Sequence, residues 1–348
     1  MCARLVHCAR PRQHTDAMSE VLDLVAAPVY LYTITCTCYY GYTRLDDYHY
    51  GDRYVVWCFQ RAFILFMYLQ MMANWAAIRY VDTSILTAAK SSALDVSTIE
   101  KIKWLNTNDI SDKETDRNQH GNGDLKRRKG TKNNTKADSS QPLVKMSYWS
   151  WKPCDRCHVN APPRCHHCPF CDTCILKRDH HCFFAGKCVG FVNQRYFVVF
   201  LFWSSFACIY AMLYFLPYFN NVVLTEHTKL ECFLPITFVK FVLGDVDFYH
   251  FNLILSFTLT LMFVFLSTAF LLDQYTLINM GWTQFEQTKV DRRKLRICDP
   301  RPLGDKVKAV LGSRPLLTLV WPLTHDTFPP CDDPFNWPQH QITHHKVK

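Results

Sequence analysis

The sequence lacks the overall hydrophobic excess expected of a chain that is apolar from end to end, since its mean hydropathy is only −0.09. The sequence also has fewer acidic residues than basic ones. The 30 Asp and Glu stand against 39 Lys and Arg, and the net charge is +9. Such a charge is typical of proteins that bind nucleic acid, or of membrane proteins with basic cytosolic loops. Apolar and aromatic residues gather in four blocks, and most charged residues lie between or after them. This segregation favours a membrane protein.

Each of the four blocks is near or beyond the length needed to cross a bilayer. They cover residues 21–39, 54–78, 196–219 and 251–278. A transmembrane helix needs roughly 20 apolar residues to cross a hydrocarbon core of about 30 Å. The first block contains Asp23 and Pro28. The second contains Arg61, whose charged end can reach the interface. Buried helices of a soluble protein are the weaker alternative, so we predict an all-α membrane protein with four transmembrane helices.

The charge of the loops predicts the orientation of these spans. Five Lys and Arg residues follow the fourth block between positions 289 and 296, and the run KRRK lies in the loop between the second and third blocks. The loop between the third and fourth blocks is acidic by comparison. An excess of Lys and Arg marks the cytosolic side of a membrane protein. We therefore expect a cytosolic N-terminal tail (1–20), a cytosolic loop (79–147), a luminal loop (220–250) and a cytosolic C-terminal region (279–348).

Three shorter segments have their own expectations. The N-terminal stretch indicates a cytosolic tail and not a cleaved signal peptide, because the first block is too long and lacks a small-residue cleavage pattern. Residues 111–141 have almost no apolar content and are predicted to be a disordered insert. The KRRK run within them suits a solvated linker better than nuclear import or contact with anionic lipid. The apolar stretch 233–243 is too short to span and is expected to be interfacial or re-entrant.

The cysteines are concentrated in one place. Of 17 in the chain, eight lie between Cys154 and Cys188, together with five histidines. Short C-x2-C steps indicate metal binding more than a disulfide framework, which implies a reducing, cytosolic environment. Two closed tetrahedral zinc sites need eight ligands, so some of these thiols and imidazoles remain free. The run Asp179-His180-His181-Cys182 places a thiol beside two imidazoles and a carboxylate, which makes it a candidate nucleophile. Spacing alone does not say which cysteines are spare.

These residues closely resemble the DHHC protein acyltransferases, or palmitoyltransferases. The matching motifs are Cys154-x2-Cys157, Pro162-Pro163-Arg164, His166-His167-Cys168-x2-Cys171-x2-Cys174, Asp179-His180-His181-Cys182, and Cys188-Val189-Gly190 with Asn193. The motifs define a cysteine-rich zinc domain over residues 148–195, and the layout of four spans extends the resemblance to most of the chain.

The resemblance implies a set of residue roles. Two structural Zn2+ ions would be held, one by Cys154, Cys157, His167 and Cys174, the other by Cys168, Cys171, His181 and Cys188. Cys182 would then be the nucleophile, with His180 as its base and Asp179 orienting His180. Cys165 would be a bystander thiol, since no adjacent base activates it.

The resemblance also implies an activity and its partners. The protein would transfer a palmitoyl group from palmitoyl-CoA, through an S-acyl-enzyme, to cysteine thiols of client proteins. The implied partners are acyl-CoA, clients with cytosolic juxtamembrane cysteines and the lipid bilayer. The implied location is the Golgi or endoplasmic reticulum. Nucleic acid is not expected as a partner, because four spans would tether the cysteine cluster to a membrane.

The sequence departs from the family pattern at a few positions. Pro-Trp after the DHHC run is replaced by Phe183-Phe184, as in a minor branch of the family, and Gln284 replaces one threonine of a Thr-Thr-x-Glu motif after the last span. These departures leave an alternative: a zinc-stabilised membrane adaptor with weak or no activity that binds client proteins.

Overall fold

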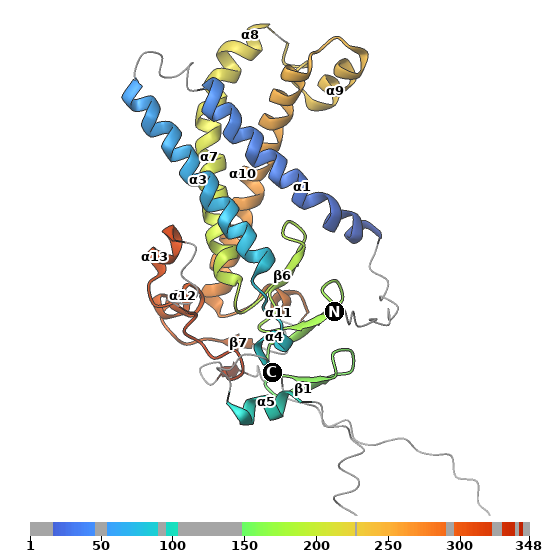
Figure 1. Cartoon of the computed structure of the whole chain (residues 1–348), viewed down its shortest axis with the longest axis vertical. Helices are drawn as coiled ribbons and strands as arrows, with labels where there is room; N and C mark the ends of the chain where they lie inside the picture. The colour runs from blue at the N-terminus through green and yellow to red at the C-terminus, as the bar shows by residue number, and fades with distance from the viewer. Residues whose placement is uncertain are drawn as a thin grey trace, which may run out of the picture.

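The computed structural model describes residues 17–45, 54–89, 95–103, 148–226, 228–289, 296–321, 329–337 and 341–343. Four long helices form a bundle: α1 (Ala17–Tyr40), α3 (Tyr54–Tyr80), α7 (Gln194–Tyr218) and α10 (Phe248–Met280). Helices α7 and α10 run close to the longest axis of the molecule, whereas α1 and α3 are tilted from it (Figure 1). Helix α7 is the centre of this bundle, because it packs against both α3 and α10, while α1 contacts α10 and α3. The bundle stands on a smaller part rich in short strands (Figure 1).

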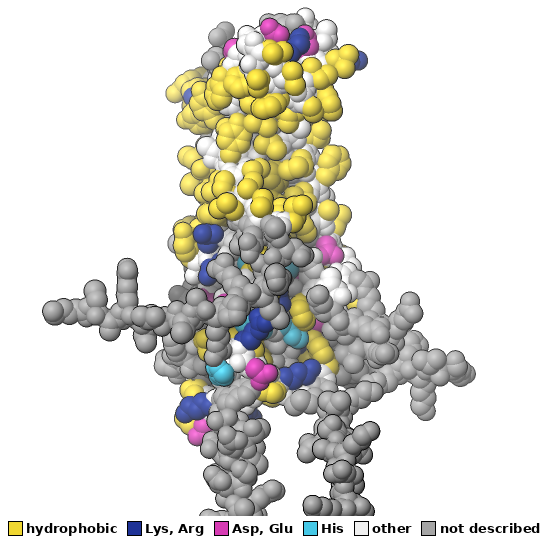
Figure 2. Space-filling view, turned by 90° about the vertical axis from the view of Figure 1, so that its right-hand side faces the viewer, with side chains coloured by type: hydrophobic (Ala, Val, Ile, Leu, Met, Phe, Trp, Pro, Cys, Tyr) yellow, Lys and Arg dark blue, Asp and Glu magenta, His cyan; other side chains and the backbone are white. Residues whose placement is uncertain are grey.

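Within the described residues, three helices are long and apolar enough to cross a membrane. They are Tyr54–Tyr80, Gln194–Val223, where α7 continues through the π-helix η2 (Phe219–Val223), and Phe248–Met280. The predicted spans 54–78, 196–219 and 251–278 lie within them. The first predicted span, 21–39, forms α1, which is not among the three. Figure 2 shows hydrophobic side chains covering the upper part of the molecule, with charged side chains below them and at the upper end.

The ends of α10 are determined by two residues. Asp247 precedes the helix, and its carboxylate accepts a hydrogen bond from the main-chain nitrogen of His250. Such a side chain satisfies one of the amide groups that a helix start leaves without a partner. Gly281 ends the helix with a positive φ of 74°, a conformation that glycine adopts without a steric penalty. The helix is therefore longer than the apolar run 251–278.

The cysteine-rich part consists of three antiparallel β-hairpins. They pair β1 (Lys152–Cys154) with β2 (Val159–Ala161), β3 (His166–Cys168) with β4 (Thr173–Ile175), and β5 (His180–Cys182) with β6 (Lys187–Val189). The protein is mostly helical, but the expectation of an all-α fold is wrong for this part. A hairpin supplies ligands both from its turn and from paired strand positions, which a single helix face does not.

Short elements surround the hairpins and the end of the bundle that lies next to them. They are α4 (Ile85–Ala89), α5 (Val96–Ile102), α11 (Gln284–Lys289), α12 (Leu303–Leu311), α13 (Pro315–Val320) and the strand pair β7 (Arg296–Cys298) and β8 (Gln341–Thr343). At the opposite end lie η1 (Gly41–Leu45), α8 (Leu224–Glu226) and α9 (Leu234–Leu243), the last corresponding to the apolar stretch 233–243. The predicted insert 111–141 lies outside the described residues.

Asn193 joins the hairpins to the bundle. Its side-chain oxygen accepts from the nitrogen of Gly190 at 2.8 Å, and its amide donates to the carbonyls of Ile78 at 3.1 Å and Cys188 at 2.9 Å. The approach is close, since a Cβ at Gly190 would lie 2.7 Å from the Cγ2 atom of Ile175. These contacts hold the last hairpin against the ends of α3 and α7.

Candidate active site and metal centres

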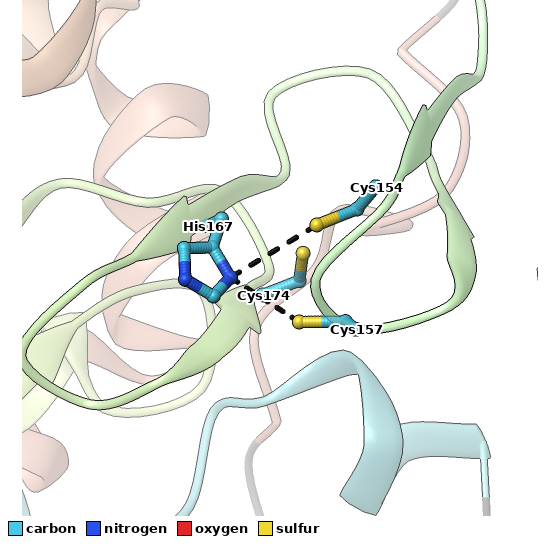
Figure 3. Close-up of side chains that lie close together, drawn as sticks. All are labelled: Cys154, Cys157, His167 and Cys174. Atoms are coloured by element: carbon cyan, nitrogen blue, oxygen red, sulfur yellow. Dashed lines mark hydrogen bonds between the residues drawn. The ribbon is translucent and has the colours of Figure 1, made fainter. Parts of the chain in front are cut away.

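Four potential ligands from the first two hairpins converge (Figure 3). Cys154 and Cys157 come from the first hairpin, whereas His167 and Cys174 are cross-strand partners in the second. One potential ligand atom from each of the four lies within 4.8 Å of all the others. The Nδ1 atom of His167 is 3.9 Å from the sulfur of Cys154 and 3.2 Å from that of Cys157.

The second and third hairpins repeat this arrangement. Cys168 and Cys171 come from the second hairpin, and the cross-strand partners His181 and Cys188 come from the third. Their ligand atoms also lie within 4.8 Å of one another. The Nδ1 atom of His181 is 3.7, 3.4 and 3.8 Å from the sulfurs of Cys168, Cys171 and Cys188, respectively.

The geometry of both groups fits a tetrahedral metal ion. Three thiols and one imidazole form a common ligand set of structural zinc sites, with metal–sulfur and metal–nitrogen distances of about 2.3 and 2.05 Å. These lengths place nitrogen and sulfur about 3.6 Å apart around a tetrahedral ion. The nitrogen–sulfur separations given above, 3.2 to 3.9 Å, bracket that value. The two groups could therefore hold metal ions.

The three hairpins follow one plan. Cys154, Cys168 and Cys182 occur at equal intervals in the chain, and each ends the first strand of its hairpin. The turns also correspond, because His158, Asp172 and Gly186, spaced at the same interval, all have positive φ.

The third hairpin differs in one ligand position. Cys157 and Cys171 follow the first cysteine of their hairpins by three positions, but the equivalent residue in the third hairpin is Ala185. Neither group of potential ligands among the described residues includes Cys182. The thiol of Cys182 occupies a ligand position of the repeat without belonging to a ligand set.

The buried Asp179 pairs with the half-buried His180 beside this thiol. The Oδ2 atom of Asp179, which is 1% exposed, lies 2.9 Å from Nδ1 of His180. Burial alone would raise the pKa of Asp179 and lower that of His180, but their mutual hydrogen bond reverses both effects. The pKa of Asp179 therefore lies below its usual value, while Asp179 and the neighbouring Cys182 raise the pKa of His180 to about 9.

A cavity of about 650 Å³ opens at these residues and extends between the helices. Asp179, His180 and Cys182 line it, and so do many apolar side chains from the bundle: Phe197, Phe200, Leu201, Phe263, Leu266 and Phe270. Ser204 also lines it, seven residues beyond Phe197 on α7, or about 10 Å at the helical rise. The hydroxyls of Ser204 and Tyr30 lie 3.4 Å apart. The cavity thus connects the thiol with the apolar interior of the bundle.

Helix α3 holds the turn that follows Cys182. The indole nitrogen of Trp75 donates to the carbonyl of Phe184, and a guanidinium nitrogen of Arg79 donates to the carbonyl of Ala185, both at 2.8 Å. Sequence reasoning missed Trp75 and Arg79, because single polar groups near the end of an apolar run form no recognisable pattern.

Arg164 and Glu286, both within motifs noted in the sequence, form a buried ion pair. Their Nε and Oε1 atoms are 2.7 Å apart, and Nη2 donates to Oε2 at 2.8 Å. Glu286 also accepts from the nitrogen of Thr283, and its own nitrogen donates to the Thr283 hydroxyl. These bonds hold the start of α11, where the nitrogen of Gln284 donates to Oδ1 of Asp179 at 2.8 Å.

One further contact to Asp179 was not predicted. The side-chain amide of Gln274 in α10 donates to Oδ2 of Asp179 at 2.8 Å. Both oxygens of the carboxylate therefore accept hydrogen bonds from outside the hairpins.

Comparison with known proteins identifies this region. Residues 148–291 match the family model described as DHHC palmitoyltransferase. Palmitoyltransferase ZDHHC20-A of Danio rerio is 38% identical over 105 residues, which cover 29% of this chain and 29% of that protein. Palmitoyltransferase ZDHHC2 of Homo sapiens is 50% identical over 72 residues, or 20% of each protein. Palmitoyltransferase ZDHHC15 of Homo sapiens is 39% identical over 82 residues, 22% of this chain and 24% of that protein.

The alignments span less than a third of the length of these curated relatives. The family match nevertheless includes both groups of potential ligands, the run from Asp179 to Cys182 and helix α11. The resemblance noted in the sequence is therefore confirmed for this region: residues 148–291 form a domain of the DHHC palmitoyltransferase family.

Proposed function

We propose that this protein transfers a long-chain acyl group, palmitoyl, from acyl-CoA to cysteine thiols of client proteins. The acyl group would be carried on Cys182 as a thioester. The observation that supports this most strongly is the position of Cys182, a thiol outside both ligand groups, beside His180 and on the wall of an apolar cavity.

The contacts of the pair suggest how the proton moves. Asp179 accepts from Nδ1 of His180, which leaves Nε2 to take the proton of the Cys182 thiol. The thiolate attacks the thioester carbonyl of acyl-CoA, a new carbon–sulfur bond forms, and CoA leaves as a thiol with the proton from His180. In the second step His180 takes the proton of a client thiol, which attacks the acyl group. Cys182 then leaves and recovers the proton.

The cavity would hold the acyl chain during both steps. Its volume of about 650 Å³ lies within the range of ligand pockets, about 300–1,000 Å³. Each methylene removed from water contributes about 0.8 kcal/mol. A long chain therefore gains more from the apolar wall than a short one does, until the cavity is full.

Zinc ions in the two Cys3His groups would stabilise the hairpins and take no part in bond making, because four protein ligands close each site. We further propose that α1 is a fourth span beside α3, α7 and α10. The hairpins and both termini would then face the cytosol, with α9 on the luminal side of a Golgi or endoplasmic reticulum membrane. The Lys and Arg residues that follow the fourth apolar block in the sequence, and those between the second and third blocks, support this orientation by the positive-inside rule.

The alternative of a weakly active adaptor is not favoured. Gln284 contributes only its main-chain N–H to Asp179, which any residue except proline would also supply. Phe183 and Phe184 both line the cavity, so their aromatic bulk remains at the site.

The test is acylation of the purified full-length protein with labelled palmitoyl-CoA. We expect hydroxylamine-sensitive label on the unaltered protein and on Cys165→Ser, and none on Cys182→Ser. Cys165 is a matched control, since it is a buried thiol of the same domain outside both ligand groups. Addition of a cysteine-containing client peptide should then remove the label from the enzyme. Equal label on the unaltered protein and Cys182→Ser would refute the proposal.

A further inference from the structure

Two glutamines connect a buried lysine to the candidate catalytic carboxylate. The ammonium of Lys177 donates to Oε1 of Gln194 at 3.1 Å, and the amide of Gln194 donates to Oε1 of Gln274 at 3.2 Å. The amide of Gln274 donates in turn to Oδ2 of Asp179 at 2.8 Å. All four side chains are buried, with Lys177 the most exposed at 8%. We call this set of four residues the lysine–glutamine chain.

The two ends of the lysine–glutamine chain determine the direction of its hydrogen bonds. An ammonium group can only donate hydrogen bonds, and an ionised carboxylate can only accept them. Each glutamine amide has one accepting and one donating end, so only one orientation of the two amides satisfies every group. Rotation of either amide would place its NH2 group against a donor and leave an acceptor unsatisfied. Buried polar groups without partners are costly, so the chain favours a single arrangement.

The chain ends on the oxygen that matters for the proposed chemistry. Oδ2 of Asp179 also contacts Nδ1 of His180, while Oδ1 is held by the nitrogen of Gln284. With both oxygens held, the carboxylate cannot turn away from the imidazole. The orientation of the His180 ring toward Cys182 therefore depends on contacts made far from the thiol.

The chain also joins separate parts of the fold. Lys177 lies between β4 and β5, Gln194 is the first residue of α7, and Gln274 belongs to α10. The ring of Trp337, from the C-terminal region, lies 5.7 Å from the lysine nitrogen. Because the lysine–glutamine chain extends from the hairpins into the helix bundle, the orientation of Asp179 depends on how both parts pack.

We propose that Lys177, Gln194 and Gln274 are positioning residues, which orient Asp179 and thereby His180 for attack by Cys182. This inference rests on the proposed acyltransferase function. None of the three touches the thiol or lines the large cavity. They therefore affect the rate of acyl-enzyme formation and leave the binding of the acyl donor unchanged.

The test uses Lys177→Met, Gln194→Met and Gln274→Met in the purified full-length protein. The rate of acyl-enzyme formation with labelled palmitoyl-CoA should fall about 10- to 100-fold, the range found when a hydrogen-bond partner that orients a metal-binding side chain is removed. The concentration of palmitoyl-CoA giving half the maximal rate, and the metal content, should stay those of the unaltered protein. Lys177→Met/Gln274→Met should be no slower than Gln274→Met alone, because one break already disconnects the chain.

Two controls separate positioning from general damage. Gln60→Met removes a buried glutamine of α3 that accepts from Tyr210 and is not connected to Asp179, so it should label at the unaltered rate. Lys177→Arg keeps a donor-only group at the start of the chain and should recover part of the loss. If Gln274→Met does not fold, Gln194→Met breaks the same chain and decides the question.

The inference is overturned if folded, metal-containing chain variants label at the unaltered rate, or if the double variant loses the product of the two single effects. It is also overturned if only the half-saturating concentration changes. These results differ from failure of the proposed function, which would appear as label on Cys182→Ser or none on the unaltered protein.

Discussion

The buried ion pair between Arg164 and Glu286 gives a quantitative test of how α11 is held beside Asp179. Two hydrogen bonds of 2.7 and 2.8 Å join the guanidinium to the carboxylate, and each side chain is 1% exposed. Glu286→Gln leaves a buried guanidinium facing a neutral amide. Breaking a buried pair from one side typically costs about 3–5 kcal/mol. We expect the free energy of unfolding to fall by about that amount.

The double variant Arg164→Met/Glu286→Met should recover part of this loss, since both charges are removed but the nitrogen of Thr283 loses its acceptor. Replacing both partners of a buried pair by apolar side chains is often neutral or stabilising, because no charge remains to be desolvated. The assay is guanidinium chloride unfolding of the full-length protein in micelles, followed by tryptophan fluorescence. As a control, Lys308→Gln breaks an ion pair with Asp305 in which both side chains are about half exposed, and should change stability by less than about 1 kcal/mol.

Two outcomes would refute this reasoning. The free energy of unfolding of Glu286→Gln could lie within about 1 kcal/mol of that of the unaltered protein, which would mean that the burial of the ion pair does not determine its contribution to stability. Alternatively, the double variant could lose as much unfolding free energy as Arg164→Met and Glu286→Met lose together when each is made alone. The two side chains would then act independently, contrary to the coupling expected of groups in direct contact.

Two further predictions concern pH and metal. Burial would raise the pKa of Glu286, but the Arg164 guanidinium holds it below the usual value. The carboxylate therefore stabilises the fold above the usual glutamate pKa of about 4.3, and this contribution is lost as the pH falls through the lower folded value. The unfolding midpoints of the unaltered protein and Glu286→Gln should converge below about pH 4, and a constant difference would contradict the assignment. Chelation should unfold the hairpins and make them protease-sensitive, and Cys168→Ala should do the same by removing one ligand of a tetrahedral set. Cys331→Ala, an exposed cysteine outside both groups, should stay resistant, and a resistant Cys168→Ala would contradict the ligand set.

The long helices were largely predictable. The apolar runs 54–78, 196–219 and 251–278 lie within α3, α7 and α10, because long stretches with at most one charged residue permit little except a helix in an apolar environment. The ends of the helices were not predictable, since α10 begins after Asp247 and ends before Gly281, where capping and not hydrophobicity decides. The first run forms α1 despite Pro28, and the structure provides only three spans that meet the length and composition of a membrane helix within the described residues.

The site was predictable in composition more than in geometry. The spacing of the cysteines and histidines indicated two metal sites, and the family resemblance divided the ligands into the two groups that the hairpins assemble. The equal interval between Cys154, Cys168 and Cys182 was a usable signal that was overlooked. Gln274 could not have been found in the same way, because it lies 95 positions from Asp179 and is a single amide in an apolar helix. Only tertiary packing brings the two together.

The repeat of the hairpins has a consequence for Cys182, the proposed nucleophile. The first and second hairpins each have two cysteines three positions apart, which is the arrangement that binds a metal ion. The third hairpin has Ala185 at the second of these positions, with only 1% of the residue exposed. Ala185→Cys would recreate the missing half of such a pair, and a stray ion or an intramolecular disulfide could then consume the thiol. The proposed role of Cys182 as a nucleophile therefore depends on the methyl group of Ala185, at a position where the first two hairpins have a cysteine.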